Sequence, residues 1–227
     1  MGQVSRHVVD LEKYDTLWAA AHPRFEAGDL QPDREPVEGD PRWGISLVLL
    51  PPDRTARTLA DAAEELGAAY DGAHHVYGEA DLHLTVTSLE PYSSGADPST
   101  IEHYVRVVEA SRDLLDVRVR LVGLGGSAAG VFVQGFDDDT LRPLRARMRA
   151  AAGDLHDGTA PPMAFVRDTA HISLSVHRQA TPEPAAARLV EGLRRRDFGT
   201  MDGGRIALVC YRPRGGSMGI EVLHAMA

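Results

Sequence analysis

The alternation of apolar and polar residues predicts a chain of short strands and amphipathic helices. Strand patterns occur at residues 44–50, 82–89, 117–122, 131–136, 169–176, 205–211 and 218–224, and helical spacing occurs at residues 54–69, 99–112, 137–155 and 182–196. Gly-rich segments at residues 123–130 and 215–216 are interpreted as turns of two hairpins. Hairpins favour antiparallel pairing, so the predicted class is α+β with helices outside the sheets.

The order of these elements divides the chain into an extension and a repeated core. Residues 1–40 hold a short helical pattern at 11–21 and then a Pro-, Asp-, Glu- and Gly-rich stretch at 28–40. We interpret them as a partly helical N-terminal extension with an irregular linker. In residues 41–227, strand–helix and hairpin units occur twice. This order suggests an ancient duplication and predicts a bilobal, pseudo-symmetric domain with a central cleft.

Two short segments carry the same pattern of an apolar residue, a histidine and alternating hydroxyls. They read LHLTVT at residues 82–87 and AHISLS at residues 170–175. Successive side chains on a strand point to opposite faces. His83, Thr85 and Thr87 are therefore expected to share one face of the first strand, and His171, Ser173 and Ser175 one face of the second. Each strand should offer a cleft one imidazole and a hydroxyl about two residues away. A single such motif is weak, but two copies in matching strands favour function.

The residue types suit phosphodiester chemistry. Opening a cyclic phosphodiester requires one group that takes a proton from water and another that protonates the departing oxygen. Two imidazoles with pKa values near 6.5 can do both at neutral pH. Hydroxyls of Thr85 and Ser173 can donate to the non-bridging oxygens, where negative charge grows. The predicted catalytic residues are His83, Thr85, His171 and Ser173, and neither a metal nor another cofactor is required.

With these motifs in place, the sequence resembles the two-histidine (2H) phosphoesterase superfamily, including the LigT-like RNA 2′,3′-cyclic phosphodiesterases. The family's two His-x-Thr/Ser motifs match His83-Leu84-Thr85 and His171-Ile172-Ser173, and the early strand at residues 45–51 resembles the family's first strand. The resemblance covers about residues 43–227. It implies cleavage of a 2′,3′-cyclic, related cyclic or 2′,5′-linked phosphodiester, often leaving a 2′-phosphate. Ser replaces the commoner Thr in the second motif, and the N-terminal extension has no counterpart in minimal members.

Residues beside these motifs are candidates for substrate binding. Tyr211 and Arg212 end a predicted strand, where an aromatic ring can stack on a base and a guanidinium can hold a phosphate. Tyr92 follows the first motif, and Arg167 and Arg178 flank the second. Surface or structural roles for these residues remain open alternatives.

Other arrangements of histidine, glycine and cysteine compete with this interpretation. A zinc site using His74 or His75 with the two motif histidines is conceivable, although no His-Glu-x-x-His motif accompanies it. The Gly-rich segment lacks the lysine of a nucleotide-binding P-loop. The single cysteine, Cys210, lies in an apolar run and is interpreted as a core residue.

Composition limits the partners. A net charge of −9 argues against broad binding to a nucleic-acid backbone, so the expected partner is a nucleotide or an RNA end rather than duplex nucleic acid. No apolar run approaches the roughly 18 residues of a membrane span, and no signal-peptide pattern is seen, so a cytoplasmic location is expected. The leading hypothesis is a metal-independent phosphodiesterase. The alternative is a module that binds a nucleotide in the same cleft without cleaving it.

Overall fold

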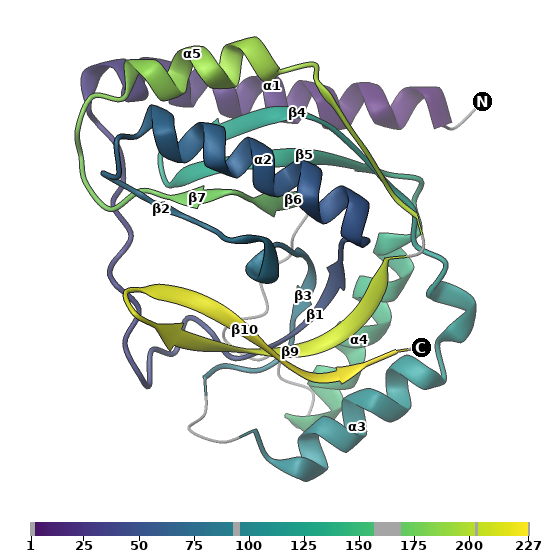
Figure 1. Cartoon of the computed structure of the whole chain (residues 1–227). Coiled ribbons are helices and arrows are strands. Elements are labelled where there is room, and N and C mark those ends of the chain that lie inside the picture. Colours follow the sequence, from purple (N-terminus) through teal and green to yellow (C-terminus); the bar gives the residue numbers. More distant parts are fainter. Residues whose placement is uncertain (1–2, 93–95, 157–168, 203, 227) are drawn as a thin grey trace.

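The computed structural model describes residues 3–92, 96–156, 169–202 and 204–226, with residues 3–10 described by their backbone alone (Figure 1). The helices are α1 (Gln3–Ala27), α2 (Asp53–Ala69), α3 (Pro98–Glu109), α4 (Leu141–Leu155) and α5 (Pro184–Leu193), with short 3-10 turns η1 (Glu79–Asp81) and η2 (Arg112–Leu114). The strands are β1 (Ile45–Leu50), β2 (His75–Val76), β3 (Leu84–Ser88), β4 (Val119–Ser127), β5 (Gly130–Asp137), β6 (Ala170–Ser173), β7 (Ser175–Val176), β8 (Asp197–Met201), β9 (Arg205–Arg214) and β10 (Ser217–Ala225).

Eight strands form one antiparallel sheet in the order β10-β9-β1-β3-β6-β5-β4-β8, and β2 pairs with β7 beside it. The two histidine-bearing strands, β3 and β6, are neighbours at its centre, with three strands on either side. Figure 1 shows β9 and β10 with α3 and α4 in the lower half, and β4 and β5 with α1, α2 and α5 in the upper half. The predicted α+β class with largely antiparallel strands is confirmed.

Helices cross between the two halves of the chain. The helix α2 follows β1 in sequence but contacts β8 and α5, whereas α4 follows β5 but contacts β3 and α3. Each helix buries one apolar stripe, for example Leu59, Ala63 and Leu66 of α2. This exchange of helices packs both halves of the sheet into a shared hydrophobic core.

The segment at residues 123–130 differs from the prediction. Residues 123–127 continue β4 instead of forming a turn, and the hairpin turns at residues 128–129. Gly123 has a φ of +79°, and a Cβ on Gly126 would lie 2.8 Å from the Trp18 ring. Glycine is therefore needed in β4 for a register shift and for close packing against an aromatic ring. In the sequence, glycines with these roles look the same as glycines of a turn.

The N-terminal helix α1 is longer than the sequence pattern suggested. It runs to Ala27 and contains Pro23, a residue that usually favours an earlier helix end. Trp18 and Phe25 of α1 and Leu30 beyond it belong to the main core. Residues 29–37 are irregular, as expected. The division of the chain into an extension and a two-lobed domain stays a prediction. Among the described residues, no helix is long and apolar enough to cross a bilayer.

Candidate active site

The two histidine motifs meet where β3 and β6 pair. Leu84 lies opposite Ile172 in antiparallel register. Continuing this register by one residue in each direction sets each histidine across from the hydroxyl of the other motif: His83 opposite Ser173, and His171 opposite Thr85. In regular pairing, opposite Cβ atoms lie roughly 5 Å apart and diagonal neighbours about 7–8 Å. A phosphoryl group fits between side chains spaced in this way.

A cavity of about 660 Å³ opens over this junction, within the size range of small-molecule sites. The motif residues that line it are His83, Thr85, His171 and Ser173. Further lining side chains come from β1, β9, β10 and the segment before β1, and they include Ser46, Tyr211, Met218, Asp33, Arg42 and Trp43. The structure therefore brings the predicted catalytic residues to one cavity.

Hydrogen bonds fix the imidazole of His83. Its Nδ1 lies 2.7 Å from the carbonyl oxygen of Asp81. A carbonyl only accepts, so Nδ1 carries a proton and donates it there. Nε2 then faces the cavity, 3.0 Å from the Tyr211 hydroxyl. In the neutral ring Nε2 accepts from that hydroxyl, whose oxygen lies 3.4 Å from Oγ1 of Thr85. Nε2 is thus the nitrogen available for proton transfer.

His171 is held by different neighbours. Its Nδ1 lies 3.4 Å from Oγ1 of Thr169, and its ring packs 5.2 Å from the ring of Phe132, measured between centroids. Phe132 is the cross-strand neighbour of Ser173 on β5. The ring of His171 is half-buried and the Ser173 side chain is exposed. The second motif thus combines a histidine packed against an aromatic ring with an accessible hydroxyl.

The first motif departs from simple alternation at Thr87. Thr87 does not line the cavity, whereas the next residue, Ser88, does. The cause is a bulge: adjacent residues Leu47 and Val48 of β1 pair with Thr87 and Thr85, so Val86 is an extra residue on β3. One extra residue reverses which side chains face the cleft. The expectation that Thr87 shares the face of His83 and Thr85 was therefore wrong.

The second motif also loses its last predicted hydroxyl. Ser175 is buried, its Oγ accepts from the backbone N–H of Val131 at 3.1 Å, and it lies 3.2 Å from the Tyr70 hydroxyl. The strand is interrupted at Leu174, between β6 and β7. Ser175 thus stabilises the packing behind the cleft and does not share the exposed face of Ser173.

The candidate substrate-binding residues are separated by the structure. Tyr211 lines the cavity. Arg212, its neighbour on β9, binds Glu221 at 2.9 Å, and the Tyr92 hydroxyl bonds to Glu38. Arg178 donates to three backbone carbonyls. Arg212, Tyr92 and Arg178 are outside the described cavity lining, and Arg167 lies outside the described residues.

Several cavity residues escaped the sequence analysis. They are Asp33, Arg42, Trp43, Ser46, Tyr77, Asp81, Ser88 and Glu90. Burial raises the pKa of Tyr77 to about 12, so its hydroxyl stays protonated as a donor. Ser46 carried a usable signal, because it interrupts an otherwise apolar strand and pairs with Ser88 on β3. Ser88 lies at the end of β3 and Asp81 in η1, and the remaining residues lie in irregular segments whose patterns carry no such signal.

The alternative of a zinc site depends on which possible metal ligands the fold brings together. Among the described residues, no group of three or more His, Cys, Asp or Glu side chains is arranged to hold a metal ion. His74 is buried, with Nε2 3.1 Å from Glu183 and its ring 4.8 Å from that of His177. Cys210 is buried, as expected for a core residue.

The arrangement of strands, helices and central cleft is the fold of the LigT-like phosphoesterases. The chain is similar to TT0787 of Thermus thermophilus, with 18% identity, a TM-score of 0.62, and coverage of 81% of this chain and 96% of that one. It is also similar to apo LigT of E. coli, with 14% identity, a TM-score of 0.54, and coverage of 82% of this chain and 96% of that one. For LigT in complex with 3′-AMP the identity is 15%, the TM-score is 0.53, and the coverage is 82% of this chain and 97% of that one. No protein-family model and no curated protein sequence matches the chain. At these identities the likeness establishes the fold.

Proposed function

We propose that this protein is a metal-independent phosphodiesterase that hydrolyses a 2′,3′-cyclic, related cyclic or 2′,5′-linked phosphodiester of a nucleotide or RNA end. The observation that carries the proposal is the convergence of His83, Thr85, His171 and Ser173 on one cavity. Neither strand alone supplies both proton-transfer groups. The antiparallel pairing of β3 and β6 brings both imidazoles to the same cavity.

The reaction balances with these groups. One neutral imidazole takes a proton from water as the water oxygen attacks phosphorus. The other, protonated, imidazole gives its proton to the sugar oxygen as the P–O bond breaks. The products are a phosphomonoester and a free hydroxyl, and the two histidines end with exchanged protonation states that solvent resets. On His83, proton transfer uses Nε2, because Nδ1 is committed to the Asp81 carbonyl.

The hydroxyls complete the site. Thr85 and Ser173 can donate to the two non-bridging oxygens, which carry the growing charge. The Tyr211 hydroxyl lies beside Nε2 of His83. When substrate binds, its phosphate either displaces this hydroxyl from Nε2 or accepts a hydrogen bond from it. E. coli LigT has been solved with ATP, NADP+ and 3′-AMP, which supports a nucleotide as the ligand of the cavity proposed here.

A panel of 2′,3′-cyclic nucleotides and 2′,5′-linked oligonucleotides tests the proposal. We expect turnover of at least one of them, full activity in EDTA, and a product whose phosphate position is read by NMR. Complete loss of activity in EDTA, restored by zinc, would instead support a metallohydrolase. Tight binding with no product from any panel member would favour the non-catalytic nucleotide-binding module.

A further inference from the structure

The helix α1 buries one stripe of side chains against β4, β5 and α5 (Figure 1). Tyr14, Trp18, Ala21 and Phe25 follow one another at helical spacing, and all four are buried. Trp18, Ala21 and Phe25 belong to the main core, whereas Tyr14 belongs to a separate aromatic cluster. Tyr14 is therefore the residue of this stripe whose contacts lie outside the main core.

The hydroxyl of Tyr14 bonds to the backbone where β5 pairs with β6. Gly135 lies opposite Ala170 in this pairing. The Tyr14 oxygen accepts from the N–H of Gly135 at 3.4 Å and donates to the carbonyl of Ala170, with the carbonyl of Gly135 3.1 Å away. Ala170 lies directly before His171 and directly after Thr169, whose Oγ1 is 3.4 Å from Nδ1 of His171. One hydroxyl of α1 thus fixes the first residue of the short strand β6.

The ring of Tyr14 approaches the same histidine through one other ring. Phe132, Gln134 and Phe136 alternate along β5 and share one face, and Gln134 lies opposite His171 on β6. The Tyr14 ring lies 5.9 Å from that of Phe132 and 5.5 Å from that of Phe136, between centroids. The Phe132 ring lies 5.2 Å from the imidazole of His171. These distances are typical of favourable aromatic pairs, so Tyr14 supports the ring on which His171 packs.

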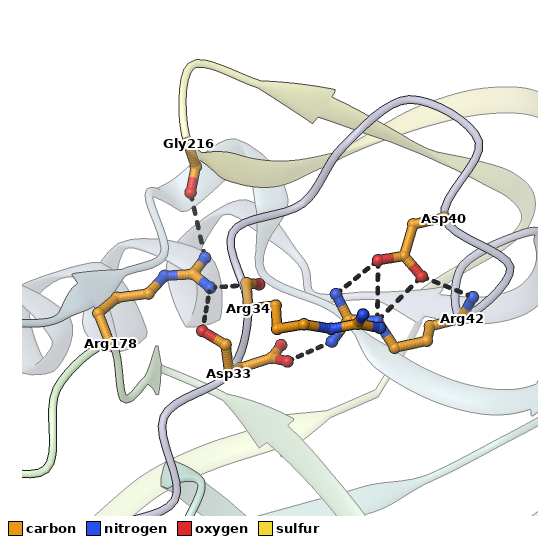
Figure 2. Close-up of polar contacts among 6 residues, drawn as sticks. All are labelled: Asp33, Arg34, Asp40, Arg42, Arg178 and Gly216. Carbon is orange, nitrogen blue, oxygen red and sulfur yellow. Dashed lines mark hydrogen bonds and ion pairs between the residues drawn. The ribbon is translucent and has the colours of Figure 1, made fainter.

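Other contacts keep α1 in place independently of this hydroxyl. Within the helix, Nε1 of Trp18 donates to the carboxylate of Glu191 on α5. Beyond the helix, the Arg178 guanidinium donates to the backbone carbonyls of residues 33–34 (Figure 2). Removing the Tyr14 hydroxyl therefore leaves the helix attached at several points, and an effect on the site can be separated from loss of the helix.

We infer that Tyr14 is a positioning residue for His171. Its hydroxyl fixes the backbone of Ala170, and its ring supports Phe132. This inference rests on the proposed function, in which His171 transfers a proton, and it extends that function by making α1 part of the catalytic apparatus. Tyr14 is outside the described cavity lining, so it acts on the imidazole and not on the substrate. Without the hydroxyl, the imidazole should occupy more orientations, and fewer of them suit proton transfer.

Tyr14→Phe tests the inference, because it removes the hydroxyl and keeps the ring. On a 2′,3′-cyclic nucleotide, kcat should fall at least ~5-fold, since small displacements of a reacting group are costly. KM should stay within ~2-fold, because no substrate contact is removed. In NMR spectra of the free protein, the imidazole Cε1–H signal of His171 should shift or broaden, whereas that of His83 should not. His171→Ala and His83→Ala assign the two signals.

Tyr70→Phe is the matched control, since Tyr70 and Tyr14 are each 1% exposed. The Tyr70 hydroxyl lies 3.2 Å from Oγ of Ser175 and 3.0 Å from Nε2 of His177, and these three residues are outside the described cavity lining. The control should lose thermal stability as a buried hydroxyl is lost, but keep wild-type kcat and the wild-type His171 signal.

The outcomes separate the inference from the proposed function. Wild-type kcat in Tyr14→Phe, an unchanged His171 signal, or an equal loss of kcat in Tyr70→Phe would overturn the inference and leave the proposed function standing. A wild-type protein that opens no cyclic nucleotide would overturn the proposed function. The NMR comparison needs no turnover, so in that case an unchanged His171 signal would still overturn the positioning by Tyr14, and a changed signal would support it.

Discussion

The protonation pattern of His83 follows from two neighbours. The carbonyl of Asp81 holds Nδ1–H, and the Tyr211 hydroxyl covers Nε2. Asp81 is itself fixed, since its carboxylate accepts from the N–H of Ile220 on β10 at 3.0 Å. The tautomer needed for proton transfer at Nε2 is thus set by backbone groups of the fold before any substrate binds.

Tyr211 supplies a residue-scale prediction. Tyr211→Phe keeps the ring but removes the hydroxyl beside His83 and Thr85. If that hydroxyl donates to the substrate phosphate, kcat/KM should fall about 10-fold or more, the effect of losing a hydrogen bond of about 1.5–3 kcal/mol to a charged group. Steady-state kinetics on a 2′,3′-cyclic nucleotide measure this change. A variant with wild-type kcat/KM would show that the hydroxyl only occupies space.

Among the elements, a buried polar cluster joins α1, α2, β7 and the β4–β5 turn. His177 is fully buried, with Nδ1 2.8 Å from the Ala128 carbonyl and Nε2 3.0 Å from the Tyr70 hydroxyl. Its ring packs 5.0 Å from that of Phe25 of α1. Burial lowers the pKa of His177 to about 4. The cluster therefore requires a neutral imidazole.

This cluster makes stability depend on pH. Between pH 6.5 and about 4 the unfolded chain binds a proton at His177 and the folded chain does not, so the free energy of unfolding should fall as pH falls. The shift corresponds to about 3 kcal/mol across this window. Urea unfolding at several pH values should show a shallower dependence for His177→Gln than for the wild type. Identical slopes would mean that His177 binds its proton equally well in both states.

Element boundaries show where sequence reasoning succeeds. The alternation that defines β3 and β6, and the helical spacing that gives most of α3, follow local rules and were predicted. The bulge at Val86 and the extended β4 depend on partners distant in sequence. A bulge reverses the face of every later side chain on the strand. The bulge at Val86 therefore makes Ser88, and not Thr87, line the cavity.

In the whole molecule, the repeated motif was enough to predict two strands that each carry a histidine and a hydroxyl, because both copies carry the same alternation. In the fold these two strands are neighbours in one sheet. The motif could not predict the cavity wall. Asp33 and Arg42 lie in the segment between α1 and β1, which is held beside the site by hydrogen bonds to residues far away in the chain, such as the bond from the Asp33 N–H to the His177 carbonyl. Arg178 was expected near phosphate from its closeness in sequence to His171, but its guanidinium donates to the carbonyls of Asp33 and Arg34.

The most direct test of the account is turnover by single histidine variants. His83→Ala and His171→Ala should each lower kcat on a 2′,3′-cyclic nucleotide at least ~100-fold, the scale of lost acid–base catalysis, with unchanged thermal unfolding. His22→Ala, which alters a partly exposed histidine of α1, should keep wild-type kcat. Near-normal kcat in either motif variant would contradict catalysis by two histidines.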